Sequence, residues 1–243
     1  MKVIAVIQAR WGSTRLPGKV LKDIEGKTML ARVVERVQKA KRIDELTVAT
    51  SMNGKDDGIV EECRRLGAGV FRGSETDVLD RFYQAVQSRS EDAVVRITAD
   101  CPLIDPEVIN QVIGAFLKEK PDYASNTLVR TFPRGLDTEV VATQALTRAW
   151  REASFPYHRA HVTPYFYENP HLFRLLSVTA EGNHSHYRWT VDTQADLDFV
   201  RAVYVRLKKN ENFGWQEVLQ LLAAEPLLTA INDHVAQKAL EEG

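Results

Sequence analysis

The first half of the chain alternates short apolar runs with amphipathic segments. Four runs have the length and composition of buried strands, and they occupy residues 3–7, 45–51, 69–71 and 92–98. After each run, apolar residues recur at helical spacing, as Leu30, Val33 and Val37 do in the first such segment. This alternation predicts an α/β fold with a doubly wound, mostly parallel sheet.

The pattern changes after residue 120, where the segments become shorter and less regular. We expect strands at 123–126, 137–141, 173–178 and 187–191, and helices at 144–153 and 159–167. Thr193 and Asp196 have capping-box spacing and should open a further helix. The interpretation is a single domain, residues 1–243, in which 123–190 form a small α+β lobe and 210–243 a helical extension.

The loop after the first strand is rich in glycine, hydroxyl groups and positive charge. It carries three cations, Arg10, Arg15 and Lys19. Gly12 and Gly18 permit tight backbone turns, and Ser13 offers a hydroxyl donor. Arginine and lysine bind phosphate oxygens, and open α/β sheets bind ligands beyond the carboxyl ends of their strands. The loop therefore predicts a nucleotide site, with a solvated surface turn as the alternative.

Two carboxylates are expected at the same edge of the sheet. Asp100 follows the strand at 92–98, and Asp192 follows the strand predicted at 187–191. Magnesium binds through one or two carboxylates together with substrate phosphates, so the pair is a candidate metal site. The alternatives are a turn residue for Asp100 and a helix cap for Asp192. Asp196 and Asp198 spell a DxD motif, but side chains two apart diverge on a helix, so we expect them at the surface.

Further candidates lie after the third strand and in the second half of the chain. Arg72 could reach a phosphate and Ser74 could cap the next helix, although a plain cap beside a solvated arginine explains them equally well. A further polar set that could bind a ligand with a carboxylate and hydroxyl groups is Arg134, Asp137, Glu139, Arg159 and His161. These residues supply a cation for a carboxylate and acceptors for hydroxyls. The alternative is a lobe held together by its own ion pairs.

Residues 7–21, IQARWGSTRLPGKVL, resemble the signature of the sugar cytidylyltransferases. The resemblance extends to about Leu207 and is closest to the branch of spore coat polysaccharide biosynthesis protein F. Related enzymes that use other nucleotides usually have two glycines at the positions of Ala9 and Arg10. The absence of these glycines here favours a cytidylyltransferase. The resemblance implies a nucleotide-diphospho-sugar transferase fold, a Rossmann-type three-layer sandwich. It also implies that CTP and a sugar acid react to give a CMP-sugar and pyrophosphate for surface polysaccharide biosynthesis.

The resemblance also assigns expected roles to individual residues. The nucleotide would contact Ala9, Arg10, Gly12, Ser13, Arg15, Lys19, Arg72, Ser74 and Asp100. The catalytic set would be Arg10, Arg15, Lys19, Asp100 and Asp192, with Asp100 and Asp192 holding Mg²⁺. A homodimer formed through residues 123–190 is expected, since the aromatic residues there could lie on its surface: Phe155, Tyr157, Tyr165 and Phe166.

Composition narrows the classes of partner. The chain has 243 residues and a net charge of -1, which gives no support for a nucleic-acid or membrane-surface partner. The sequence shows no signal-peptide pattern and no apolar run of membrane-spanning length, so we expect a cytoplasmic protein whose two cysteines are reduced. Two other functions stay open: a glycosyltransferase that consumes a nucleotide sugar, and a non-catalytic nucleotide-binding partner.

Overall fold

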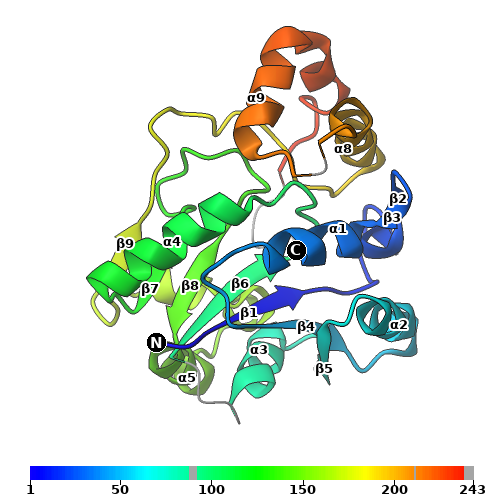
Figure 1. The fold of residues 1–243 in the computed structure, drawn as a ribbon. Coiled ribbons are helices and arrows are strands. Elements are labelled where there is room, and N and C mark those ends of the chain that lie inside the picture. Colours follow the sequence, from blue (N-terminus) through cyan, green and yellow to red (C-terminus); the bar gives the residue numbers. More distant parts are fainter. Residues whose placement is uncertain (88–91, 211, 238–243) are drawn as a thin grey trace.

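The computed structural model describes residues 1–87, 92–210 and 212–237, and a seven-stranded sheet forms its centre (Figure 1). The strand order is β5-β4-β1-β6-β8-β7-β9. The strands are β1 (Val3–Gln8), β4 (Glu45–Ser51), β5 (Gly69–Gly73), β6 (Ala93–Thr98), β7 (Tyr123–Ser125), β8 (Glu139–Ala142) and β9 (Leu175–Ser177). β8 runs antiparallel to β6 and β7, whereas the other neighbouring strands pair in parallel. The predicted doubly wound, mostly parallel sheet is confirmed.

The remaining elements cover the sheet or extend beyond it. They are η1 (Lys19–Leu21), the ribbon β2 (Asp23–Ile24) and β3 (Lys27–Thr28), α1 (Met29–Gln38), η2 (Gly54–Asp56), α2 (Asp57–Arg65), α3 (Val78–Val86), α4 (Pro106–Glu119), α5 (Thr143–Glu152), α6 (Pro156–His161), α7 (Pro164–Tyr167), α8 (Gln194–Leu207), α9 (Trp215–Ala224) and η3 (Pro226–Ile231). No helix within the described part of the chain is both long and apolar enough to cross a lipid bilayer.

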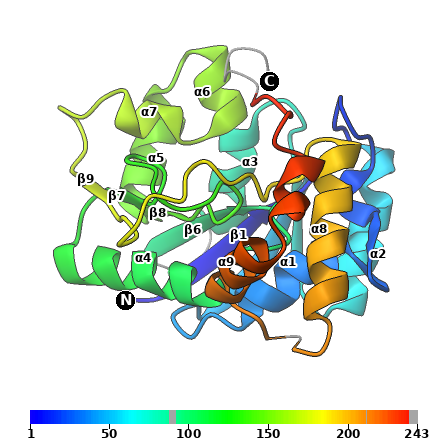
Figure 2. The same ribbon diagram turned by 90° about the horizontal axis from the view of Figure 1, so that it is seen from above.

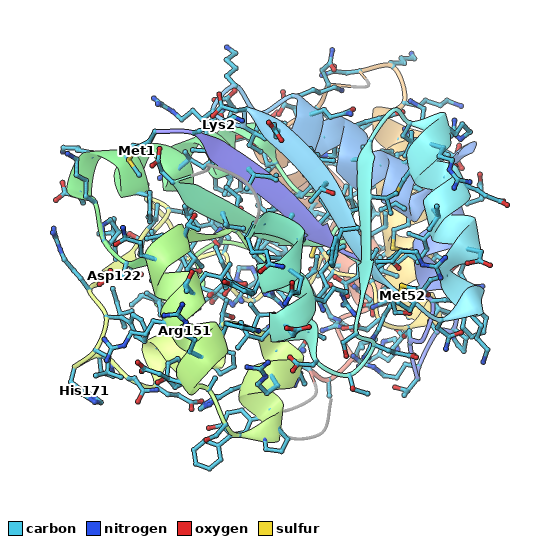
Figure 3. The ribbon with its side chains drawn as sticks, turned by 90° about the horizontal axis from the view of Figure 1, so that it is seen from below. Met1, Lys2, Met52, Asp122, Arg151 and His171 are labelled. Carbon is cyan, nitrogen blue, oxygen red and sulfur yellow. The ribbon has the colours of Figure 1, made fainter. Side chains whose placement is uncertain are left out.

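Alternation along β1 divides the core between the two faces of the sheet. Val3, Ala5 and Ile7 pack in one cluster with apolar residues of α1, α2 and α4. Ile4 and Val6 point the other way, into a cluster with residues of α3 and α5. Figure 3 looks onto this second side, with α3 and α5 in front of the strands. The result is a three-layer sandwich with β1 buried at its centre.

Most helix starts follow the sequence, and one does not. Thr28, Asp105 and Thr193 cap α1, α4 and α8, and the cap predicted at Thr193 is thereby confirmed. The predicted cap of α3 at Ser74 is wrong, because Asp77 accepts from an amide of the first turn of that helix. The Ser74 hydroxyl instead accepts from the Asp77 amide, so it shapes the preceding turn.

The second half departs further from the sequence predictions. The helix predicted at 159–167 is two short helices, because Val162 adopts φ +72° and Pro164 follows it. The strand predicted at 187–191 is wrong, since the segment makes only one isolated bridge, between Arg188 and Arg134. Residues 123–190, predicted to form a lobe, contribute β7, β8 and β9 to the central sheet.

The aromatic residues predicted at a dimer surface lie in different environments. Tyr165 and Phe166 are buried, where they pack with Phe173 in the α5-side core. Phe155 is 59% exposed, and it stacks on Tyr157. The prediction that all four are exposed is therefore wrong, and the homodimer stays a prediction.

The C-terminal helices form a third core beside α1 (Figure 2). Two buried residues tie this extension to the sheet layers. Asp105 caps α4 with one carboxylate oxygen and accepts from the Trp215 amide, at 2.8 and 2.7 Å respectively. The Arg36 guanidinium donates to the carbonyls of Ile104 and Phe213 and lies over the Phe213 ring. These contacts fix the start of α9 against α4.

Replacing the buried Asp105 should destabilise the fold. Asp105→Ala removes a helix cap and leaves the Trp215 amide without its acceptor, so we expect a loss of about 2–4 kcal/mol in the free energy of unfolding. Urea denaturation followed by circular dichroism measures it. Glu61→Ala, at an exposed position of α2, is the control and should change this free energy by less than about 0.5 kcal/mol. Equal losses of unfolding free energy in the two variants would contradict the stabilising role of Asp105.

Candidate active site

A cavity of about 400 Å³ opens at the carboxyl ends of β1 and β6. These strands are neighbours in the sheet. The strands that follow β1 in the chain, β4 and β5, lie on one side of this pair, and those that follow β6, namely β7, β8 and β9, lie on the other side. Such a reversal of strand order is the topological switch point at which open α/β sheets bind ligands. Nine predicted site residues line the wall: Arg10, Ser13, Arg15, Lys19, Asp100, Arg134, Asp137, His161 and Asp192.

The Lys19 ammonium group is at the centre of the charged wall. Its Nζ donates to Asp100 Oδ2 at 2.8 Å, to Asp192 Oδ1 at 2.9 Å and to the Val191 carbonyl at 2.8 Å. Lys19 is only 8% exposed. Burial alone would lower the pKa of Lys19, but the two carboxylates raise it above its ordinary value, so the group stays charged. The structure thus brings together the predicted lysine and both predicted acids.

Asp100 lies in the turn that follows β6 and remains ionised. Burial opposes its charge, but the Lys19 ammonium and the Thr98 hydroxyl lower the pKa of Asp100 to about 2. The neighbouring Cys101 behaves oppositely, because burial and the Asp100 charge raise the pKa of its thiol. Cys101 is therefore a neutral wall residue, which agrees with its buried position.

Asp192 contacts three cations. Lys19 binds one carboxylate oxygen, and Arg15 and Arg188 bind the other at 2.9 and 2.8 Å. Its backbone is placed by the preceding residue, because the Val191 amide donates to the Asp100 carbonyl at 2.8 Å. Sequence reasoning missed Arg188, and the only available signal was its position four residues before Asp192.

The glycine-rich loop has a fixed shape. The Trp11 amide donates to Asp56, and the Gly18 amide donates back to the Trp11 carbonyl at 2.9 Å. Gly18 has φ +66°, and a Cβ there would lie 2.7 Å from the Trp11 indole nitrogen, so glycine is required. Asp56 is buried; although burial opposes its charge, hydrogen bonds from Ser51, Trp11 and Thr50 lower its pKa. This anchor of the loop was not predicted.

The cavity lining also includes a cation, the guanidinium of Arg134, that has no hydrogen-bond or ion-pair partner among the residues that the structure describes. Within residues 1–87, 92–210 and 212–237, the guanidinium of Arg134 makes no hydrogen bond or ion pair, whereas Asp137 is paired with Arg130 at 2.6 and 2.8 Å. Burial, followed by the Arg130 charge, lowers the pKa of Arg134. Gly135 adopts φ +111°, and a Cβ there would lie 2.6 Å from the Trp189 backbone. Glycine at this position lets the Arg134 segment approach the segment before Asp192.

Six predicted residues do not line the cavity. They are Ala9, Gly12, Arg72, Ser74, Glu139 and Arg159. Arg72 pairs with Asp57, and Arg159 pairs with Asp77. Glu139 is buried between Arg96 and Tyr123. The structure thus engages these three charged side chains in ion pairs or hydrogen bonds, and their contact with a substrate stays a prediction.

Several wall residues were not among the predicted site residues. They are Gln8, Thr14, Val20, Arg96, Thr98, Ala99, Cys101, Thr190 and Gln237. Arg96 is a charged residue inside the apolar strand β6, where it contacts Glu139 and Gln8. A cation within a buried strand was the signal that could have identified it.

Of the two DxD aspartates predicted at the surface, only Asp198 lies there. Asp196 is 0% exposed and accepts from Arg188 at 2.8 Å, whereas Asp198 is exposed and contacts Gln194. The expectation for Asp196 is therefore wrong, because a partner on the preceding segment compensates its buried charge.

The donor set of the cavity fits magnesium with phosphate ligands. Among the described residues, no group of three or more His, Cys, Asp or Glu side chains could hold a metal ion. Asp100 and Asp192 supply two carboxylates around a single cation position, now taken by the Lys19 ammonium. Magnesium is held through one or two carboxylates when phosphates complete its ligand shell, so the two residues fit that ion.

Comparison with known proteins decides the family. A family model described as cytidylyltransferase matches residues 4–231. The chain belongs to the cytidylyltransferase family. Spore coat polysaccharide biosynthesis protein SpsF of Bacillus subtilis (strain 168) is 34% identical over 231 residues, covering 92% of this chain and 95% of that protein. The resemblance of residues 7–21 to cytidylyltransferases is thereby confirmed.

Solved structures show the same fold. A cytidylyltransferase from Leptospira borgpetersenii serovar Hardjo-bovis (strain JB197) matches with a TM-score of 0.91 and 31% identity, covering 98% of this chain and all of that one. CMP:2-keto-3-deoxy-manno-octonic acid synthetase complexed with CTP matches with a TM-score of 0.63 and 21% identity, covering 85% of this chain and 99% of that one. The second likeness shows that the fold is shared.

The ionised Asp100 should make the stability of this cytidylyltransferase depend on acid pH. Its folded pKa of about 2 lies below the ordinary value of 3.8, so its stabilising effect is present above pH 5 and is lost as the pH falls through 2. The full effect is about 2 kcal/mol. From pH 5 to pH 3, the difference in free energy of unfolding between the unsubstituted protein and Asp100→Asn should narrow by about 1 kcal/mol. Urea denaturation at both pH values tests this, and a constant difference would contradict it.

Proposed function

We propose that this cytidylyltransferase transfers CMP from CTP to a hydroxyl group of a sugar acid and releases pyrophosphate. The observation that carries the proposal is the convergence of Lys19 and Arg15 with Asp100 and Asp192 at the switch point of the sheet. Two cations suit a triphosphate, and two carboxylates suit its metal ion. The family supports cytidine as the base.

The proposed reaction is an in-line displacement at the α-phosphorus. A sugar oxygen forms a bond to this phosphorus, and the bond to the bridging oxygen of pyrophosphate breaks. The proton of the sugar hydroxyl passes to water. Such a transfer depends mainly on positioning and on neutralising charge. Lys19, Arg15 and Arg10 would bind the triphosphate and the leaving pyrophosphate, since all three lie in the cavity wall.

Asp100 and Asp192 would hold Mg²⁺. When bound, the ion supplies Lewis-acid polarisation of the phosphate oxygens and a template for the triphosphate. The low pKa of Asp100 supports this assignment, because a carboxylate that stays ionised is available as a metal ligand.

Arg134 supports an acidic sugar as the acceptor. Arg134 lines the cavity and its guanidinium has no partner within the described part of the chain, so this group can form a paired hydrogen bond with a carboxylate from the ligand. The name of one structural relative includes 2-keto-3-deoxy-manno-octonic acid, which is a sugar acid. Asp137 and His161 lie in the same wall and could contact sugar hydroxyls.

The glycosyltransferase alternative has less support. A DxD motif binds a metal only if both carboxylates face the ligand, but Asp196 is fully buried and Asp198 points to solvent. The remaining alternative, a non-catalytic nucleotide-binding partner, is tested by the first experiment below. A homodimer and a cytoplasmic location stay part of the proposal.

Asp192→Asn should separate an enzyme from a binding module. Loss of this negative charge should reduce pyrophosphate release from CTP and a sugar acid by at least about 100-fold, because it removes one metal ligand. Calorimetric binding of CTP without metal should change by no more than about threefold. Pyrophosphate release is measured with a coupled assay, and CTP is compared with UTP, GTP and ATP.

The matched control is Asp198→Asn, which makes the same change at an exposed position of α8 and should leave turnover unaltered. If the unsubstituted protein binds CTP but releases no pyrophosphate with any sugar acid, the binding-module alternative is favoured. If only a nucleotide sugar binds, the glycosyltransferase alternative replaces the proposal.

Arg134→Met should weaken binding of the sugar acid selectively. Removing the cation should raise the KM for the sugar acid by about 10–100-fold, while the KM for CTP changes less than about threefold. The preference for the free acid over its methyl ester should also disappear. Arg151 on α5, labelled in Figure 3, is not among the residues that line the cavity, so Arg151→Met should change neither constant. An unchanged preference for the free acid would overturn the assignment to Arg134.

A further inference from the structure

The strongest feature that the proposed chemistry leaves unexplained is the buried cluster behind Asp192. It consists of Arg188, Asp196 and Asn232, and it joins the cavity to the C-terminal segment. None of these residues lines the cavity. Asp196 and Asn232 are nevertheless almost fully buried, and so is the side chain of Arg188. Buried polar groups of this kind require hydrogen-bond partners.

Asp196 is the hub of this cluster. Its Oδ2 accepts from the amides of Asp192 and Thr193, at 3.0 and 2.9 Å, and from the Thr193 hydroxyl. Its Oδ1 accepts from Arg188 Nε at 2.8 Å and from Asn232 Nδ2 at 2.9 Å. Burial would raise the pKa of Asp196, but Arg188 and Asn232 lower it, so the hub stays ionised. Asp196 therefore fixes the backbone from which the Asp192 side chain projects.

Arg188 links Asp196 directly to the side-chain carboxylate of Asp192. Its Nε binds Asp196 and its Nη2 binds Asp192 Oδ2 at 2.8 Å. A guanidinium group is planar and rigid, so the two acids are held at a fixed distance and orientation. The Asp192 carboxylate is thus constrained from its backbone and from its tip.

Asn232, in the C-terminal segment, binds both Arg188 and Asp196. It follows η3, is 2% exposed, and donates through one amide nitrogen to Asp196 Oδ1 and to the Arg188 carbonyl, each at 2.9 Å. A few residues later, Gln237 accepts from Arg188 Nη1 at 2.6 Å. The C-terminal segment therefore contacts both the backbone and the guanidinium of Arg188.

We infer that Asn232 is a positioning residue for the active site, acting through Arg188 and Asp196 to orient Asp192. The inference deepens the proposed function, since it rests on Asp192 as a metal ligand. Residues that orient metal ligands from behind commonly change metal affinity or activity by about 10–100-fold when they are replaced. The segment 232–237 is then a component of the active site.

The test compares Asn232→Ala with Asn169→Ala. Asn169 also donates an amide hydrogen to a backbone carbonyl, at 2.8 Å, but it follows α7 and touches neither Arg188 nor Asp196. Three quantities are measured: hydrogen exchange of the peptide that contains Asp192 and Thr193, Mn²⁺ binding in the presence of CTP by electron paramagnetic resonance, and the kcat of pyrophosphate release. Asn232→Asp, which places another carboxylate beside Asp196, is the isosteric variant.

Asn232→Ala should speed exchange of the Asp192 and Thr193 amides at least fivefold, weaken Mn²⁺ binding about 10–100-fold and lower kcat by a similar factor. Asn232→Asp should reduce Mn²⁺ binding and kcat further, because its carboxylate and that of Asp196 repel each other. Asn169→Ala should leave all three unchanged. Unchanged exchange in Asn232→Ala would overturn the positioning role. Failure of the unsubstituted protein to bind Mn²⁺ with CTP would refute the proposed function instead, while the exchange data would still decide the role of Asn232.

Discussion

The buried ammonium of Lys19 is the interaction on which the site depends. It joins three segments that are far apart in sequence, since its partners are Asp100 after β6 and Asp192 before α8. A buried cation is tolerated only when charges and hydrogen bonds compensate it, and removing one partner leaves a costly unpaired charge. The loop after β1, the turn after β6 and the segment before α8 converge in the folded chain, where they compensate the buried charge of Lys19. Folding therefore brings together the charges that we propose for catalysis.

The same balance suits the proposed reaction. Without substrate, the positive charges of Lys19 and Arg15 are neutralised by carboxylates of the protein. A triphosphate with its metal ion brings both signs of charge, so the cations can bind phosphate while the carboxylates bind the metal. Neither state then leaves an unpaired buried charge. Arg134 differs, since its charge has no partner within the described residues and can be compensated by a carboxylate from the acceptor.

The sequence predicted the part of the fold and site that follows from local patterns. Strand periodicity and the rule that parallel strands end at one edge placed Asp100 and Lys19 correctly. Pro164 was a local signal that the helix predicted at 159–167 is broken, but the positive φ of Val162 could not be predicted from its residue type. The DxD motif was misplaced because the partners of Asp196 lie 8 and 36 residues away, and helical spacing carries no information about them. Contacts between distant segments are the part that pattern analysis could not supply.

The C-terminal extension is attached to the rest of the fold at two points, one at its start and one at its end. At its start, the Asp105 carboxylate holds the Trp215 amide, which fixes α9 to the layer that carries α4. At its end, Asn232 holds the Arg188 and Asp196 pair behind the active site. An extension that only completed the core would need apolar contacts and no buried polar bonds at its far end. The second attachment is polar and buried, and it leads through Arg188 to the Asp192 carboxylate, which supports the proposal that the extension orients the site as well as stabilising the fold.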